Sequence, residues 1–69
     1  MEATVINKVN NYRTKAGVTQ EQLAVRIGVT RQTIIAIERG NYTPSVLLAL
    51  KLAKEFGVSV ETLFSISYE

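Results

Sequence analysis

The chain has 69 residues, 46% of them hydrophobic, with a formal net charge of +2 and neither cysteine nor histidine. This length allows one domain, spanning 1–69, and the slight basic excess favours a polyanionic partner. Because cysteine, histidine and aspartate are all absent, the usual general bases, metal ligands and most activators of a nucleophile are missing, and we expect no enzyme, no metal and no cofactor. The lack of a signal-peptide pattern and of an apolar run of about 20 residues predicts a cytoplasmic protein.

Glycines and one proline divide the chain into segments of helix length, at Gly17, Gly28, Gly40, Pro44 and Gly57. Within these segments apolar residues recur mostly at spacings of three and four, which is typical of amphipathic helices. We therefore predict an all-α fold with five helices.

The first two predicted helices lie before Gly28. The first runs from about Ile6 to Ala16. The second begins at Thr19, and Gln22 three residues later completes a capping-box pattern, in which each side chain bonds the backbone N–H of the other residue.

The remaining three helices follow short connections. Thr30 is the expected N-cap of a third helix that stops at Gly40, and Ser45 caps a fourth that ends at Gly57. Ser59 opens a short last helix. A hydroxyl at the N-cap accepts a hydrogen bond from a free N–H group of the first turn, and a glycine allows the left-handed stop.

The end of the chain changes its period. Phe64, Ile66 and Tyr68 alternate with polar residues, and a period of two indicates a short strand or a dimerisation tail over residues 65–69. The β-branched stretch 4–6 is the candidate partner of such a strand, forming a short terminal β-ribbon. A frayed terminal segment is the alternative.

From Gln20 to Arg39 the chain resembles the helix-turn-helix of the Cro and repressor family, the xenobiotic-response-element-like group of small transcriptional regulators. In that unit the small Ala24 lets two helices approach, and Gly28 makes the turn between them. The apolar positions of the unit are filled by Leu23, Ile27, Val29, Ile34 and Ile37. The resemblance covers residues 6–64, is strengthened by the segments VTRQTI, IERG and YTPS, and implies a phage-repressor-like domain that binds DNA.

The outer face of the predicted third helix suits base recognition. An α-helix turns about 100° per residue, and Ile34 and Ile37 set its inward direction. Gln32, Ala36 and Arg39 then point outward. Ile35 lies at the edge of that outer face, and Arg31 projects from the helix start. Arginine can bind guanine, glutamine can bind adenine, and apolar side chains can touch a thymine methyl in the major groove. The predicted base-reading residues are Arg31, Gln32, Ile35 and Ala36. An ordinary solvated helix face is the alternative.

Phosphate contacts require hydrogen-bond donors on either side of the groove. The residues predicted for this role are Gln20, Thr30, Thr33, Arg39, Asn41 and Tyr42. Two of them could serve the fold instead, because Thr30 would cap a helix in any case and Tyr42 could be a packing residue.

Arg13 and Glu38 have opposite charges and lie near the boundary of buried faces. Members of the family often join the first helix to the end of the third with such a pair. The resemblance therefore implies a structural ion pair between them, with no role in DNA binding or catalysis.

A homodimer is expected, because one domain of this size reads few base pairs and paired half-sites lie about 34 Å apart. The predicted interface residues are Val60, Leu63, Phe64, Ile66 and Tyr68. The chain is thus predicted to be a regulator that binds double-stranded DNA at operator half-sites, most simply a repressor, and to be associated with the nucleoid.

A protein-interaction module, such as an antitoxin or an adaptor whose DNA binding depends on a partner, is the alternative function. Leu47 and Ile35 support it, because both are expected at exposed positions where related sequences commonly carry polar residues. Lys51 and Lys54 share the exposed side of the fourth helix with Leu47, and a solvated face accounts for these lysines more simply.

Overall fold

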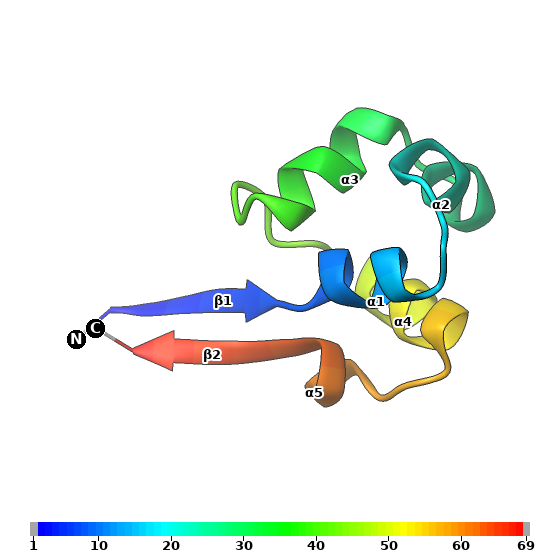
Figure 1. The fold of residues 1–69 in the computed structure, drawn as a ribbon. Helices are drawn as coiled ribbons and strands as arrows, with labels where there is room; N and C mark the ends of the chain where they lie inside the picture. The colour runs from blue at the N-terminus through cyan, green and yellow to red at the C-terminus, as the bar shows by residue number, and fades with distance from the viewer. Residues whose placement is uncertain (1, 69) are drawn as a thin grey trace.

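The computed structural model describes residues 2–68. Their elements follow in the order β1 (Ala3–Asn7), α1 (Val9–Lys15), α2 (Gln20–Ile27), α3 (Arg31–Glu38), α4 (Val46–Phe56), α5 (Val60–Leu63) and β2 (Phe64–Tyr68). Figure 1 shows the helices gathered into one body, from which the two strands extend together as a ribbon. The predicted five-helix fold with a terminal β-ribbon is confirmed. None of the helices in this part of the chain is long and apolar enough to cross a membrane.

Local capping explains where most of the helices begin. The hydroxyls of Thr19, Thr30, Ser45 and Ser59 each accept a hydrogen bond from the backbone N–H three residues later. The backbone N–H of Thr19 in turn donates a hydrogen bond to the side-chain oxygen of Gln22, at 2.9 Å, which completes the predicted capping box. Each such cap stabilises a helix by roughly 1 kcal/mol.

The start of the first helix differs from the prediction. Helix α1 begins at Val9, and Ile6 lies in β1, where it pairs with Ser65 of β2. Asn7 marks the boundary, because its side-chain oxygen accepts a hydrogen bond from the N–H of Val9 at 3.1 Å. Pairing with a strand almost 60 residues away along the chain overrides the helical spacing that begins at Ile6.

The core lies between the helices and draws on all five of them. Its largest fully buried side chains are Val9, Leu23, Ile34, Ile37, Leu52 and Leu63. Burying an aliphatic side chain of this size contributes about 1.5 to 3 kcal/mol relative to leaving it in water. This core fixes α3 against the body by its inner face and leaves its outer face free.

The ribbon pairs antiparallel from Ala3 with Tyr68 to Asn7 with Phe64. Directly opposed residues share a face, so the register separates an apolar face from a more polar one. The apolar face carries Ala3, Val5, Phe64, Ile66 and Tyr68, with Asn7 at its base, and the other face carries Thr4, Ile6, Ser65 and Ser67. Glu69, the last residue of the predicted tail, lies outside the described residues.

Candidate nucleic-acid interface

The turn between α2 and α3 gives the two helices their relative orientation. Gly28 ends α2 with φ 79° and ψ 35°, in the left-handed region that favours glycine. The N–H groups of Gly28 and Val29 both donate to the carbonyl of Ala24, at 2.9 and 3.0 Å. Ala24 is 1% exposed, so a larger side chain there would meet packed neighbours. The chain then passes through Thr30 directly into α3.

The outer face of α3 presents free polar groups. Arg31 and Gln32 are exposed, and neither side chain forms a hydrogen bond or an ion pair with another residue of the range 2–68. One turn later on the same face, Ile35 and Ala36 are half-buried. Figure 1 shows α3 along one edge of the helical body, with no other described element beyond its outer side. Arg31 and Gln32 can therefore reach a large external ligand without breaking internal contacts.

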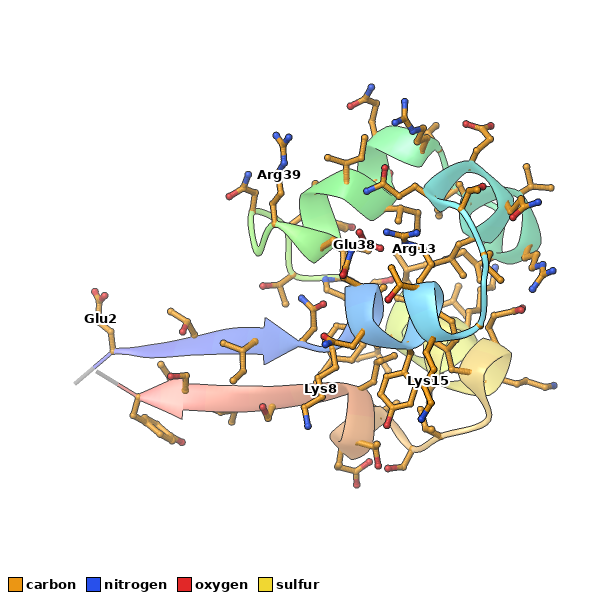
Figure 2. All side chains as sticks on the ribbon, in the orientation of Figure 1. Glu2, Lys8, Arg13, Lys15, Glu38 and Arg39 are labelled. Carbon is orange, nitrogen blue, oxygen red and sulfur yellow. The ribbon has the colours of Figure 1, made fainter. Side chains whose placement is uncertain are left out.

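The residues predicted to contact phosphate flank this face. Arg39, Asn41 and Tyr42 are exposed just after α3, and Figure 2 shows Arg39 pointing away from the helical body. Thr30 is exposed and Thr33 half-buried at the start of α3, where both hydroxyls take part in the cap. Gln20 differs from the others, because its amide already donates one hydrogen bond inside the protein.

Glu38 is the centre of a polar network on the inner side of α3. Its carboxylate forms an ion pair with Arg13, with the Nε to Oε2 distance 2.6 Å and the Nη2 to Oε1 distance 3.2 Å. Asn10 and Gln20 also donate to Oε1, at 3.0 and 3.1 Å, and Arg13 donates further to the carbonyl of Val18. Figure 2 shows Arg13 and Glu38 facing each other between α1 and α3. The network thus joins α1, α2 and α3.

The two charges are held in their ionised forms. Burial alone would raise the pKa of Glu38, but hydrogen bonds from Arg13, Asn10 and Gln20 and the charge of Arg13 outweigh it and lower the pKa below its usual value. The hydrogen bond to Glu38 raises the pKa of Arg13, against the opposing effect of burial. With side chains only 12% and 5% exposed, the pair acts as a scaffold contact and not as a proton donor or acceptor.

The sequence did not predict the roles of two asparagines in this region, Asn7 and Asn10. Asn10 lies three residues before Arg13, so both side chains lie on the same side of α1, and this spacing could have indicated a shared partner. Asn7 donates to the carbonyl of Ile37 at 2.9 Å, joining the base of the ribbon to the end of α3. Nothing local in the sequence indicates that second contact, because 30 residues separate its partners.

The residues predicted for a dimer interface occupy different environments. Leu63 is 1% exposed and belongs to the core, so its assignment to an interface was wrong: α5 turns this side chain inward. Val60 is half-buried, and Phe64 packs partly against the core. Only Ile66 and Tyr68, which are 60% and 63% exposed, lie on the free part of the ribbon.

A family model described as helix-turn-helix matches residues 9–63. The chain belongs to this Cro/C1-type helix-turn-helix family. It is 57% identical over 58 residues to an uncharacterized HTH-type transcriptional regulator of Methanocaldococcus jannaschii, covering 84% of this chain and 88% of that protein. Over 59 residues it is 36% identical to the cryptic phage CTXphi transcriptional repressor RstR of Vibrio cholerae, covering 86% of this chain and 53% of the repressor.

The fold of this helix-turn-helix protein is also similar to a solved structure. The crystal structure of the restriction-modification controller protein C.AhdI from Aeromonas hydrophila superposes with a TM-score of 0.74 and 31% sequence identity, covering 80% of this chain and 83% of that one. The chain is therefore a member of a family of DNA-binding transcriptional regulators, which are not enzymes.

Proposed function

We propose that this helix-turn-helix protein recognises specific double-stranded DNA by placing α3 in the major groove. The observation that carries the proposal is the outer face of α3, where Arg31 and Gln32 are exposed and unpaired among the described residues on a helix held rigidly from behind. Arginine and glutamine can each form two hydrogen bonds to a base edge, to guanine and adenine respectively. Ile35 and Ala36 would add apolar contacts to thymine methyl groups.

Phosphate contacts on both sides of α3 would set its register on the duplex. Arg39, Asn41 and Tyr42 are exposed at one end of the helix, and Thr30 and Thr33 lie at the other. The hydroxyls of Thr30 and Thr33 share one hydrogen bond, and the Thr30 hydroxyl also accepts the cap bond, so one of the two hydroxyl hydrogens remains able to donate to a phosphate oxygen.

Gln20 can also take part without loss of its internal contact. Its amide nitrogen carries two hydrogens, of which one is directed to Glu38. The second hydrogen would connect a phosphate to the network that holds α3 in place.

The protein would act as a homodimer joined through the ribbon. The apolar face of the ribbon exposes Val5, Ile66 and Tyr68 by 37%, 60% and 63%. A two-fold contact between two such faces would remove these side chains from water and place two copies of α3 on successive half-sites. Phe64 and Val60 would border that contact, and Leu63 would not take part.

Transcription would be repressed where the paired domains cover an operator, and the resemblance to the phage repressor RstR supports repression over activation. Binding to chromosomal DNA would place the protein in the cytoplasm, at the nucleoid. The protein-interaction function remains the second candidate, and Leu47 favours it, because this side chain is 64% exposed on α4.

Selection from a pool of random duplexes with the full-length chain tests the proposal directly. We expect enrichment of a sequence with two related half-sites whose centres lie about one helical turn of DNA, or a multiple of it, apart. A pool that shows no enrichment would contradict sequence-specific binding. Binding that becomes specific only after a second protein is added would support the interaction module.

A further inference from the structure

A second exposed surface lies on α4 and has no counterpart in the DNA-binding proposal. Val46, Leu47 and Leu50 are 77%, 64% and 54% exposed. Helical spacing places them with Lys51 and Lys54 on the side of α4 opposite its buried residues. These five residues, here called the α4 face, combine an apolar N-terminal part with a basic C-terminal part.

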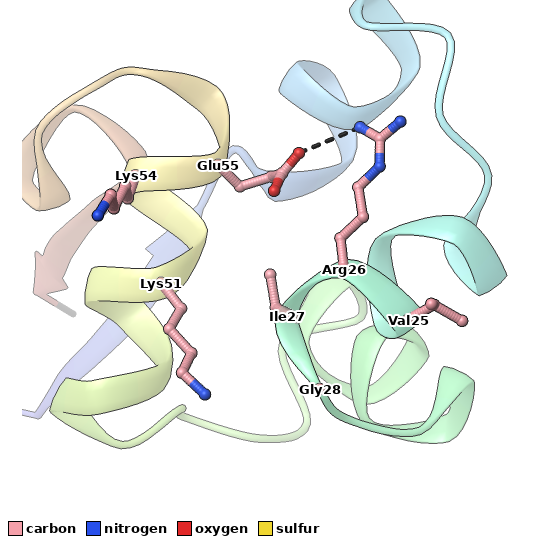
Figure 3. Close-up of a pocket in the computed structure, with 7 residues that line it drawn as sticks. All are labelled: Val25, Arg26, Ile27, Gly28, Lys51, Lys54 and Glu55. Atoms are coloured by element: carbon pink, nitrogen blue, oxygen red, sulfur yellow. Dashed lines mark hydrogen bonds and ion pairs between the residues drawn. The ribbon is translucent and has the colours of Figure 1, made fainter.

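The α4 face continues into a groove between α4 and α2. The groove has a volume of about 560 Å³, and Lys51 and Lys54 line its α4 side. On the α2 side it is lined by Val25, which is 73% exposed, and by Arg26. Figure 3 shows the ion pair between Arg26 and Glu55 bridging the two helices, while Lys51 reaches along the opening without a partner among the residues drawn.

The charges of this region are unbalanced. Arg26, Lys51 and Lys54 contribute three positive charges, and Glu55 contributes the one negative charge among the residues that line the groove, so the local charge is +2 (3 − 1). The carboxylate of Glu55 is already paired with Arg26 at 3.1 Å. Neither lysine forms an ion pair with any residue between 2 and 68.

The combination of side chains limits what can bind there. A second copy of the chain docked by a two-fold contact would bring identical lysines together, and like charges in contact oppose association. DNA phosphates would match the lysines but would gain nothing from three exposed aliphatic side chains, which lose solvent only against apolar atoms.

We propose that the α4 face and the adjoining groove dock an acidic amphipathic helix of another protein. Apolar residues of that helix at spacings of three and four would contact Val46, Leu47 and Leu50, and its carboxylates would pair with Lys51 and Lys54. Leu47 and Lys51 line a pocket together with Tyr42, so the α4 face adjoins the proposed phosphate contacts, but it includes none of the base-reading residues of α3. The proposal therefore does not depend on which DNA sequence the protein reads.

The experiment uses a displayed library of random peptides about 16 residues long, enough for about four helical turns, selected against the full-length chain. Recovered peptides are expected to be amphipathic and acidic. Lys51→Glu combined with Lys54→Glu should weaken their binding at least about tenfold, and Leu47→Ser should weaken it severalfold. Replacing the glutamates of a recovered peptide by lysines should restore its binding to the variant that carries both Lys51→Glu and Lys54→Glu.

Lys8→Glu combined with Lys15→Glu is the matched control, because it makes the same total charge change at two exposed positions at the ends of α1, and it should leave peptide binding unchanged. Urea unfolding of each variant shows that the fold persists. Recovery of peptides without acidic amphipathic character would overturn the proposal. So would lysine variants that bind peptide normally but show a lower affinity for duplex DNA and a smaller salt dependence, because Lys51 and Lys54 would then be phosphate contacts. The duplex selection tests the proposed function separately.

Discussion

On the inner side of α3, the side chain of Glu38 is 5% exposed and accepts hydrogen bonds from Arg13, Asn10 and Gln20. At the start of the same helix, Arg31 and Gln32 are exposed and bond to no other side chain of the described residues. Charged and amide side chains of similar chemistry therefore have two different roles on α3. Those around Glu38 hold the helix in place, and those at its start remain available to a ligand. Substitutions in the first group should change stability, and substitutions in the second should change DNA recognition.

The two faces of the ribbon formed by β1 and β2 also differ from each other, in their exposed side chains. One of its faces exposes Ile66 and Tyr68, and the other carries Ser65 and Ser67. Since the faces differ in polarity and not in backbone pairing, a change on either one should leave the strands intact while altering only what that face can contact.

The largest effect is expected for Glu38→Ala, which should lower the free energy of unfolding by about 3 to 5 kcal/mol. Arg13 would remain largely buried without a counter-charge, and Asn10 and Gln20 would lose their acceptor. Urea unfolding measures the change. As a control, Glu55→Ala breaks a pair whose side chains are 51% and 26% exposed, and should cost less than about 1 kcal/mol. Equal costs for the two variants would show that the inner network is no stronger than a surface pair.

Ile66→Glu should weaken self-association by at least about 2 kcal/mol, because it places a charge on each copy of the proposed apolar contact. Sedimentation equilibrium gives the dimer dissociation constant. Ser65→Glu adds the same charge on the opposite face of the same strand and should have little effect. If both variants dimerise as tightly as the unchanged chain, the ribbon is not the interface.

Arg31→Ala and Gln32→Ala should each weaken specific binding by about 1 to 3 kcal/mol and relax preference at different base positions. Unfolding free energy should stay the same, since neither side chain has an internal partner among the described residues. Duplex selection with each variant reports the base preferences. A variant that selects the same bases as the unchanged chain removes that residue from base recognition.

The stability contributed by the network around Glu38 should decrease gradually in acid. Because the pKa of Glu38 is lower in the folded chain than in the unfolded one, its contribution to stability is complete above the ordinary glutamate value of about 4.3. That contribution is lost as the pH falls through the lower folded value. Urea unfolding from neutral to acidic pH measures the free energy of unfolding of the unchanged chain and of Glu38→Gln. The difference between the two should decrease as the pH falls. A difference that does not change with pH would show that the ionisation of Glu38 does not contribute to stability.

Arg39→Ala is expected to have the smallest effect. If Arg39 contacts phosphate, the slope of log affinity against log salt should decrease by roughly one unit. Lys8→Ala removes a positive charge at the opposite side of the body, where Figure 2 shows Lys8 pointing away from α3, and should leave the slope unchanged. Identical slopes for both variants would assign Arg39 to a solvated helix end.

Much of the fold and part of the site could be predicted. The helix-turn-helix was visible because Thr19, Gly28 and Thr30 act within three or four residues of their own positions. The polarity of the outer face of α3 followed from the period of Ile34 and Ile37. The Arg13 and Glu38 pair, implied by the resemblance, is present. Its additional donors were not predicted, because Asn10 and Gln20 reach Glu38 from two other helices.

The sequence by itself determined where α2, α3, α4 and α5 begin and where α2 and α4 end, since hydroxyl caps and left-handed glycines act on their own neighbours and need no distant partner. Only the tertiary structure decided that Ile6 belongs to a strand, that Leu63 is buried and that Asn7 reaches Ile37. Each of these depends on a contact between residues far apart in the chain, and such contacts form only when the whole core packs. A local sequence pattern gives the secondary structures that a segment can adopt, and packing against the rest of the protein decides which of them forms.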